Sequence, residues 1–394
     1  MESMIQFDFD KDCYGCGLCA QECPVGAIKM MQNREGFAMP VVDSSICVNC
    51  GKCDKACIRT SKHDGIDIGQ SKIYAYYLKN GNQRKKSTSG GAFYALANAT
   101  IESGGIVCGC VWNDKMEAEI VATDTLEGIE RMRGSKYVES SIRCYDEIKQ
   151  ALKKKRRVLF SGLPCQVAAV QKLFGQNENL TTAALLCEGT ASTLAWQKYK
   201  VELENRVNSN MVNAIHRQTG KYGWIAPIAE YEFANGKKIH TLSFTLDEYV
   251  HNMIYGFFTR NSCYHCGFKA NDSTADLMIG DFWGLPKELM RASRNLGCSV
   301  VLVNSEKGKA LLEKTFNGAE YREVDLETVS KRNPPLLNSA GKNGYRDQIL
   351  TELQTRNFHD VVNQYCGMNT TKVKIQRLLH KFGLAGIAKR ILRG

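Results

Sequence analysis

The chain has 394 residues, 43% of them hydrophobic, and a formal net charge of +11. Such a length leaves room for a small module and one or two further domains. No run approaches the roughly 18 consecutive apolar residues of a membrane span, and residues 1–12 lack the apolar segment of a signal peptide. Residues 371–394 contain seven lysines and arginines and no acidic residue, so the rest of the chain has a net charge of only +4. This ordinary value argues against nucleic-acid binding.

Two cysteine runs, at residues 13–23 and 47–57, share one spacing. Three cysteines are separated by two residues each, and a fourth follows after three more. Three cysteines so spaced can hold one 4Fe–4S cluster, whereas the fourth ligates the other cluster in two-cluster ferredoxins. Zinc or disulfides are the alternatives, but structural zinc prefers separated cysteine pairs and no histidine pattern is present. The expected ligands are Cys13, Cys16, Cys19 and Cys57 for one cluster, and Cys47, Cys50, Cys53 and Cys23 for the second.

The cysteine content also bears on the cellular compartment. Seventeen cysteines without an export signal indicate a reducing environment, in which thiolates stay available for metal. We therefore expect a cytoplasmic protein.

The chain then divides into three parts and a linker. Residues 1–62 are expected to form a ferredoxin module, 61–71 a linker, 72–340 a mixed α/β domain, and 345–394 C-terminal helices. Asn235-Gly236 predicts a hairpin, and Ser192 caps a long helix. The expected strands are 73–78, 106–112, 118–123, 158–161, 181–187, 228–233, 238–244, 275–279 and 300–303. The expected helices are 92–102, 142–154, 164–174, 192–207, 247–259, 307–316, 345–365 and 373–392.

A third group of cysteines emerges from strand direction. Cys165 follows the strand 158–161, and Cys187 ends the strand 181–187. In an open α/β sheet, ligands bind at the carboxyl ends of parallel strands. Together with the pair Cys263 and Cys266, four thiols could meet there. They could hold a third 4Fe–4S cluster or zinc, or be a coincidence; the electron-transfer module favours the cluster.

Two loops could hold a cofactor. The segment 87–91 opens a helix, where free backbone amides favour an anion such as a pyrophosphate. The segment 133–137 offers positive charge, a hydroxyl and an aromatic ring. Each could equally be a turn with a helix cap. No Gly-x-Gly-x-x-Gly fingerprint is present, so a flavin would require a fold other than Rossmann. Asp276 and the segment 280–284 could position a ring cofactor or a base, or form a turn with core aromatics.

Together these motifs resemble the family of coenzyme F420 hydrogenase/dehydrogenase beta subunits. The resemblance covers residues 72–340 and rests on the order of six motifs: Ser-x-Ser-Gly-Gly (87–91), Arg-Gly-Ser-Lys-Tyr (133–137), Gly-x-Pro-Cys-Gln (162–166), Cys-x-Gly (187–189), Cys-x2-Cys (263–266) and Gly-Asp-Phe-Trp-Gly (280–284). The family commonly has histidine at the position of Glu188, which weakens the transfer of F420 as the substrate.

The resemblance implies both cofactors and residues. Family members bind FAD and a 4Fe–4S cluster, and move electrons between one-electron clusters and a two-electron hydride acceptor. The implied cluster ligands are Cys165, Cys187, Cys263 and Cys266. The implied flavin contacts are Ser87, Ser89, Gly90, Gly91, Gly134, Ser135, Lys136 and Tyr137.

The expected function is that of an FAD-dependent iron–sulfur oxidoreductase. A flavin exchanges two electrons as hydride but can pass them singly, and clusters carry one each. Electrons would pass between residues 1–62, a redox partner such as ferredoxin or another oxidoreductase subunit, and a small organic substrate. The alternative is a non-catalytic relay subunit of a larger redox complex. The sequence identifies no catalytic residue.

The basic helix expected at 373–392 allows two interpretations. It could dock on its own domain with its lysines and arginines in solvent. It could instead contact an anionic membrane surface or an acidic partner, as basic amphipathic helices do.

Overall fold

The N-terminal lobe repeats one local structure twice. The computed structural model describes residues 9–60, 65–221, 223–241 and 246–367, and positions 375 and 378. In each cysteine run a glycine with positive φ, Gly17 (74°) or Gly51 (68°), begins a short helix, because glycine adopts this conformation without steric cost. The lobe contains α1 (Phe9–Asp12), α2 (Leu18–Gln21), the antiparallel hairpin β1 (Ile28–Gln32) and β2 (Ala38–Val42), and α3 (Lys52–Ala56).

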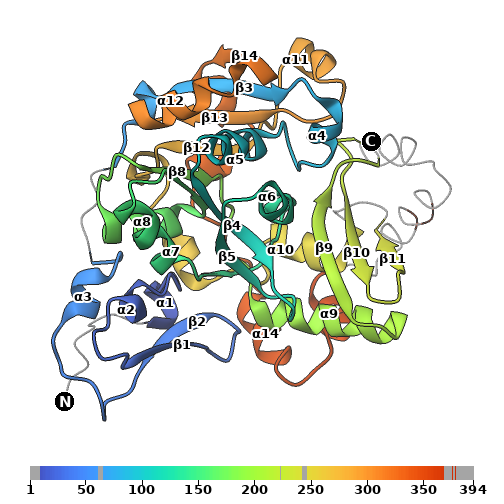
Figure 1. Cartoon of the computed structure of the whole chain (residues 1–394). Helices are drawn as coiled ribbons and strands as arrows, with labels where there is room; N and C mark the ends of the chain where they lie inside the picture. Colours follow the sequence, from blue (N-terminus) through green and yellow to red (C-terminus); the bar gives the residue numbers. More distant parts are fainter. Residues whose placement is uncertain are drawn as a thin grey trace.

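A nine-stranded mixed sheet forms the centre of the molecule (Figure 1). Its strands lie in the order β14-β3-β13-β12-β8-β7-β4-β5-β6. Their bounds are β3 (Lys72–Leu78), β4 (Ile106–Trp112), β5 (Ala118–Thr123), β6 (Ser140–Ile142), β7 (Val158–Gly162), β8 (Leu180–Leu185), β12 (Leu277–Asp281), β13 (Ser299–Val303) and β14 (Ala319–Val324).

Four neighbouring strands of this sheet, β4, β7, β8 and β12, run parallel to one another. Their carboxyl ends therefore lie along one edge. Trp112 ends β4, Cys165 follows β7, Cys187 follows β8, and Asp281 ends β12. Since both faces of such a sheet are covered, its buried strands are almost entirely apolar, as in Val158–Gly162.

Helices cover both faces of the central sheet. On one face α7 (Tyr145–Lys153) and α8 (Pro164–Phe174) share an apolar core with the sheet. On the other face α5 (Ala92–Glu102), α6 (Leu126–Met132) and α12 (Glu306–Glu313) share a second core. Three smaller helices complete this domain: α4 (Gly81–Lys85), α11 (Lys287–Ala292) and α13 (Leu326–Ser330).

A three-stranded antiparallel sheet stands beside the central one, on the right of Figure 1. Its order is β11-β10-β9. Trp196 and Tyr249 lie at the centre of the aromatic core that joins it to the surrounding helices. The elements are α9 (Thr193–Val207), β9 (Met211–Gln218), β10 (Ile228–Phe233), β11 (Lys238–His240), α10 (Glu248–Ile254), α14 (Arg346–Glu352) and α15 (Phe358–Tyr365).

The N-terminal lobe is part of two of these three cores, the one around α7 and α8 and the aromatic one. Leu18, Ala56 and Ile58 pack with α7 and α8, whereas Phe37 and Met39 pack into the aromatic core. All five side chains are at most 7% exposed. The lobe is therefore continuous with the rest of the molecule through buried apolar contacts, which makes the orientation between them defined.

The expected classes of structure agree with the observed ones more closely than the boundaries do. A ferredoxin-like lobe followed by a mixed α/β domain is confirmed. The single helix expected over 345–365 is wrong, because the chain breaks between α14 and α15, where the Asn357 side chain accepts a hydrogen bond from the Asp360 amide and caps a new helix.

Two further expectations concern the C-terminal helix and membrane spans. The basic helix expected at 373–392 lies outside the described residues, apart from the helical positions 375 and 378. Among the described helices, none has the length and apolar character to cross a membrane.

We predict that Asp247 makes stability pH-dependent. Its buried carboxylate caps α10 and accepts hydrogen bonds from the hydroxyls of Tyr199 (2.8 Å) and Tyr231 (3.0 Å). Burial raises the pKa of Asp247 to about 6, although these hydrogen bonds lower it. The folded state thus favours the protonated form, and its stabilisation is lost as pH rises through about 6. Between pH 5 and pH 8 the free energy of unfolding should fall by about 1.4 kcal/mol from this group.

The measurement is urea unfolding at both pH values for the wild type and Asp247→Asn. The variant should lose that part of the pH dependence. Asp325→Asn is the control, because Asp325 also caps a helix but is exposed. Equal pH dependence in the wild type and Asp247→Asn would contradict the assignment.

Candidate functional site: three groups of thiols and a basic pocket

The first thiol group combines both cysteine runs. Cys13, Cys16 and Cys19 from the first run interact electrostatically with Cys57 from the second. Burial, together with the neighbouring thiols Cys13 and Cys57, raises the pKa of Cys16 to about 12. Uncompensated thiolates are thus unfavourable here, whereas iron would stabilise them. The structure brings together the four residues that the interleaved spacing predicts.

The second expected group lies closer to the surface. Cys53 neighbours Cys50, whose thiol is exposed. The Cys23 sulfur accepts a hydrogen bond from the Ala27 amide (3.2 Å), as cluster ligands commonly do. The Cys47 thiol lies 3.7 Å from the Asn49 side-chain oxygen.

The third group gathers cysteines that are far apart in the sequence. Cys165, Cys187, Cys263 and Cys266 line one small cavity at the carboxyl edge of the central sheet. Burial raises the pKa of Cys165 strongly, and the three other thiols add to the effect. A backbone amide, that of Gly189, donates to the Cys187 sulfur at 3.3 Å.

The donor set fits an iron–sulfur cluster better than a single ion. Within the described residues, no group of three or more His, Cys, Asp or Glu side chains is arranged around one metal ion. In a 4Fe–4S cluster the four thiolates bind four different irons, so they need not converge on one point. Two cations, Arg260 and Lys269, line the same cavity and can balance the negative charge of such a group.

The first and third thiol groups adjoin each other. The Cys16 thiol is close enough to raise the pKa of Cys165. Tyr14 lies at this contact: its hydroxyl accepts from the Gly267 amide (3.1 Å), and its ring packs edge-on against Phe268. From the other side the Tyr145 hydroxyl donates to the Cys16 carbonyl (3.1 Å). Buried contacts therefore run continuously from the N-terminal lobe to the sheet edge.

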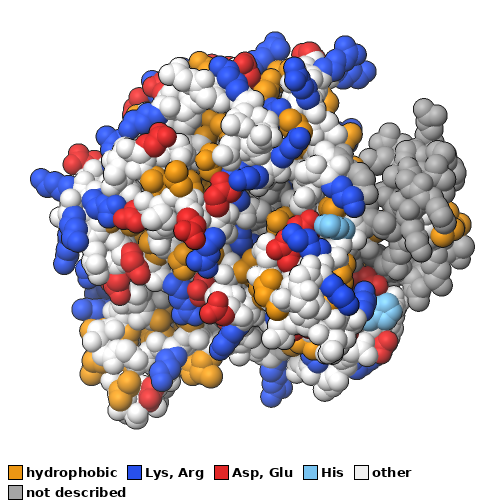
Figure 2. Space-filling model, turned by 45° about the vertical axis from the view of Figure 1, so that its right-hand side comes forward, with side chains coloured by type: hydrophobic (Ala, Val, Ile, Leu, Met, Phe, Trp, Pro, Cys, Tyr) orange, Lys and Arg blue, Asp and Glu red, His pale blue; other side chains and the backbone are white. Residues whose placement is uncertain are grey.

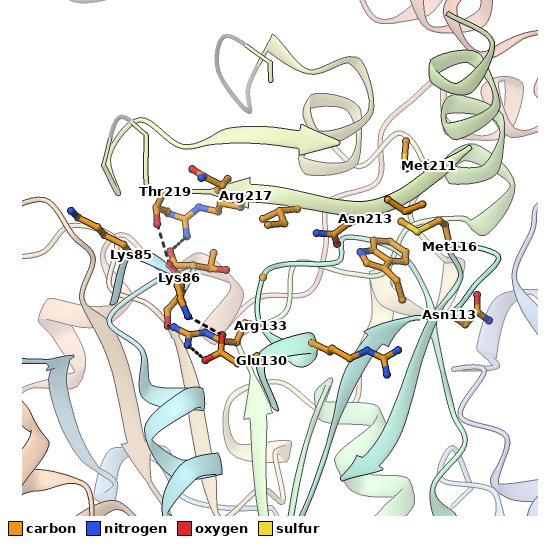
Figure 3. Close-up of a pocket in the computed structure, with 18 of the residues that line it drawn as sticks. Lys85, Lys86, Asn113, Met116, Glu130, Arg133, Met211, Asn213, Arg217 and Thr219 are labelled. Carbon is orange, nitrogen blue, oxygen red and sulfur yellow. Dashed lines mark hydrogen bonds and ion pairs between the residues drawn. The ribbon is translucent and has the colours of Figure 1, made fainter. Parts of the chain in front are cut away.

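A pocket of about 770 Å³ opens at the same edge, between β9 and the loops that precede α5 and follow α6 (Figure 3). This volume is typical of a cofactor or small-molecule site. Arg217 of β9 and Thr219, just after this strand, lie on one side, and Lys86, Glu130 and Arg133 lie opposite. The charged lining residues are Lys85, Lys86, Arg131, Arg133, Arg217, Asp114, Glu127 and Glu130.

The pocket has donors to spare for an anion. The buried Nε atoms of Arg133 and Arg217 have no hydrogen-bond partner among the described residues. Glu130 pairs with Arg133 (2.8 Å) and with Lys86 (3.7 Å), and Asp281 pairs with Arg217. An unpaired buried N–H costs about 1–3 kcal/mol, so these two arginines are held in the pocket wall at some expense of stability.

Only two of the eight expected flavin contacts line this pocket, Ser87 and Gly134. The other positions have visible structural roles. The Ser89 hydroxyl donates to the Cys298 carbonyl (2.9 Å), and Ser135 donates to Thr88 (3.3 Å). The Lys136 ammonium donates to three carbonyls of its own turn, including that of Arg133 (3.1 Å).

The remaining three residues, Gly90, Gly91 and Tyr137, also have contacts or backbone conformations that the fold itself requires. A Cβ on Gly90 would lie 2.2 Å from the Tyr76 carbonyl, and Gly91 has a φ of 92° before α5. The Tyr137 amide donates to His216 Nδ1 (2.8 Å), so its backbone is held against β9. As flavin contacts these residues stay predictions.

Sequence reasoning did not identify Arg217, which is 1% exposed. It donates to the Thr88 carbonyl (3.0 Å), pairs with Asp281 and lies over the Trp283 ring at 4.8 Å. Asp281 also accepts from the Trp224 indole (2.8 Å). The acid of the Gly-Asp-Phe-Trp-Gly motif therefore holds a pocket arginine. No local pattern marks Arg217, because Asn213, His216 and Gln218 of the same strand are polar as well.

Asp276 lies away from the pocket, directly before β12. It accepts hydrogen bonds from the Thr182 amide (2.8 Å) and the Ser305 hydroxyl (2.6 Å). These contacts join β8, β12 and α12 at the sheet edge opposite the pocket. Asp276 is thus a structural residue.

Glu188 directly follows Cys187 of the third thiol group. Burial raises its pKa, Lys269 of the thiol cavity lowers it, and Asp281 and Arg217 of the pocket wall act in opposite directions. Its neighbours therefore belong to both sites. The pocket, the third thiol group and the first thiol group form one series along the sheet edge.

Comparison with known proteins agrees with these parts. Residues 155–329 match the C terminus of the coenzyme F420 hydrogenase/dehydrogenase beta subunit, and residues 12–60 match the 4Fe-4S dicluster domain. One subunit of the F(420)H(2) dehydrogenase of Methanosarcina mazei is 25% identical over 335 residues, 81% of this chain and 87% of the relative. The expected resemblance to this family, with a dicluster domain in front, is confirmed.

A solved structure is also similar. The F420-reducing NiFe hydrogenase complex from Methanosarcina barkeri includes a chain that is 18% identical, with a TM-score of 0.44 over 74% of this chain and 90% of that one.

The expectation that this chain is an FAD-dependent enzyme in its own right is wrong. The matched family is described as a beta subunit, and the relative from Methanosarcina mazei is named as one subunit of a dehydrogenase. Both are components of enzyme complexes, and neither description includes FAD. What is supported is an iron–sulfur protein with a two-cluster domain.

We expect the third thiol group to bind one cluster. Protein reconstituted anaerobically should contain about twelve irons, and Cys263→Ser with Cys266→Ser should lower this to about eight. Cys366→Ser is the control, because Cys366 is also partly buried but follows α15 away from the cavity. Iron and zinc are counted by plasma emission spectrometry. An unchanged iron count in the double variant would refute the assignment, and zinc in place of iron would make the group structural.

Proposed function

We propose that this protein is an electron-transfer subunit of a redox complex. In this role it passes single electrons between a partner protein at the N-terminal lobe and a ligand in the basic pocket. The series of three thiol groups between those two places is the observation that carries the proposal. The name of the relative from Methanosarcina mazei, a dehydrogenase subunit, supports membership of such a complex. A cytoplasmic location stays a prediction.

The order of the thiol groups supports directional transfer. The second group is the outermost, with Cys50 exposed at the surface. The first group lies at the junction and adjoins the third, and Glu188, next to Cys187 of the third group, senses the charges of Asp281 and Arg217 in the pocket wall. When occupied, the clusters would supply one-electron carriers. The chain's own residues fix the sequence of those carriers and keep water from the inner two.

An apolar surface surrounds the outermost group. Hydrophobic side chains appear at the lower left of Figure 2, where Figure 1 places the N-terminal lobe. Six large hydrophobic side chains in residues 25–48 are between 41% and 60% exposed. Such a patch on a globular domain commonly marks an interface. The patch consists of Val25, Met31, Val41, Val42, Ile46 and Val48.

We predict that a charge on this patch blocks transfer from a protein donor. Val48→Glu with Met31→Glu should reduce the rate of electron uptake from a reduced two-cluster ferredoxin at least tenfold, because a buried, unpaired carboxylate opposes docking. Reduction by dithionite, which needs no docking surface, should be unchanged. Both rates are measured anaerobically by stopped-flow bleaching of the iron–sulfur absorbance.

The matched control is Val201→Glu, an exposed valine (46%) on α9. This variant should behave as the wild type with both donors. Equal slowing by ferredoxin and dithionite in the patch variant would show damage to the clusters instead. An unchanged ferredoxin rate would remove the patch from the proposed interface.

The pocket is proposed to bind a ligand that bears phosphate or carboxylate groups. Its lysines and arginines outnumber its acids: Lys85, Lys86, Arg131, Arg133 and Arg217 line it with Asp114, Glu127 and Glu130. Around the hollow near the middle of Figure 2, basic side chains are visible. FAD in this pocket and hydride transfer to a small organic substrate stay predictions.

We expect FAD to bind through the lysines at the pocket mouth. Lys85→Gln with Lys86→Gln should raise the dissociation constant about tenfold, since two charge-assisted contacts are lost, and the loss should be smaller at high salt. The titration follows quenching of FAD fluorescence. Lys149→Gln, on the exposed side of α7, is the control. If the wild type does not bind FAD, the flavin prediction fails while the relay proposal stands.

A further inference from the structure

Arg260 joins the N-terminal lobe to the main domain. Its guanidinium donates to the Cys13 carbonyl (2.8 Å) and the Ala38 carbonyl (3.0 Å), and lies over the Phe37 ring at 4.8 Å. It also forms an ion pair with Glu139, which precedes β6. The Arg260 side chain is 1% exposed. A full positive charge is therefore held in the interior, at the contact between the two parts.

This charge faces two thiol groups at once. The Arg260 guanidinium donates to the Cys13 carbonyl (2.8 Å), and the Arg260 side chain shares the lining of one cavity with Cys263. Cys13 belongs to the first group and Cys263 to the third. Arg260 also lines the cavity of the third group. Its Nε is buried and has no hydrogen-bond partner among the described residues, so an N–H donor remains available there.

Glu139 only partly cancels this charge at the thiols. Its carboxylate accepts a hydrogen bond from the Ala38 amide (2.9 Å), which holds it on the lobe side. Both members of the pair line the cavity of the third group, but it is the guanidinium that donates to the Cys13 carbonyl (2.8 Å). The cation is thus the member of the pair that contacts the first group. Gly15 permits this arrangement, because a Cβ there would lie 2.5 Å from the Glu139 carboxylate and 2.7 Å from the guanidinium.

We propose that Arg260 is a positioning residue that sets the reduction potentials of two adjacent clusters, those of the first and third thiol groups. The inference rests on the proposed function, since it requires clusters in both groups. Reduction adds one negative charge to a cluster, and a nearby buried cation stabilises that charge. Net charge and hydrogen bonds to sulfur are known determinants of cluster potentials. Arg260 thereby raises the reduction potentials of both clusters, so that the two inner carriers shift in the same direction.

The test compares a variant that loses only the negative charge of the ion pair with a variant that loses both charges. Glu139→Gln leaves the cation uncompensated and should raise both midpoint potentials. Arg260→Gln combined with Glu139→Gln removes both charges, retains similar shapes, and should lower both relative to the wild type. The expected size is at least a tenfold change in the equilibrium constant for one-electron reduction, which is about 59 mV. Potentials are read from redox titrations followed by electron paramagnetic resonance, with signals assigned by Cys→Ser variants.

The second thiol group is the internal reference, and its potential should not move. Arg260→Lys is the conservative variant and should restore a potential near the wild-type value, because the charge is kept. Arg346→Gln is the matched control: Arg346 is also buried and also contacts the lobe, through Glu35 (2.6 Å), but it pairs with Asp347 on its other side. This control should leave all three potentials in place.

Each result decides the inference separately from the proposed function. Unchanged potentials in Glu139→Gln and in the double variant, with twelve irons retained, would overturn it while the relay remains. A Lys variant as low as the Gln variant would also overturn it, because geometry and not charge would be responsible. Absence of clusters in the wild type would instead refute the proposed function.

Discussion

The parallel direction of four adjacent strands determines where chemistry can occur in this protein. Because β4, β7, β8 and β12 all end at one edge of the sheet, residues that are far apart in the sequence meet there. Cys165 and Cys187 come to the same cavity only for this reason. Arg217 reaches the pocket because Asp281, the last residue of β12, holds it there. The opposite edge carries structural contacts such as those of Asp276.

The N-terminal lobe follows from a second constraint, the burial of sulfur. Thiols whose pKa is raised by burial need either metal or positive charge nearby if they are to ionise. The lobe turns its first thiol group toward the main domain and leaves the second at the surface. Buried side chains from both parts, including Leu18 and Phe37, fill the contact. Electron carriers and apolar packing thus share one interface, so the orientation of the lobe is set by the same contacts that shield the clusters.

The sequence predicts the parts of this protein better than their assembly. The cysteine spacing predicts the interleaved group around Cys57, because local turns determine it. Alternating strands and helices predict the mixed domain, and strand ends predict the third thiol group. Arg260 and Glu139 are separated by 121 residues and carry no local pattern, so only the folded structure shows their pairing. The glycines at 90 and 91 show the reverse case, in which a motif suggested a ligand and the structure shows close packing.

The junction at Gly15 limits how freely such modules can be exchanged. Two-cluster ferredoxin domains are self-contained in their cluster ligands, and in principle one could replace another in front of the same α/β domain. Here the space beside residue 15 is filled by an ion pair, and a single methyl group would displace it. A grafted module with any side chain at that position would keep its own clusters yet sit differently on the domain. Compatibility between the two parts therefore depends on glycine at position 15, which has a hydrogen atom where every other amino acid has Cβ.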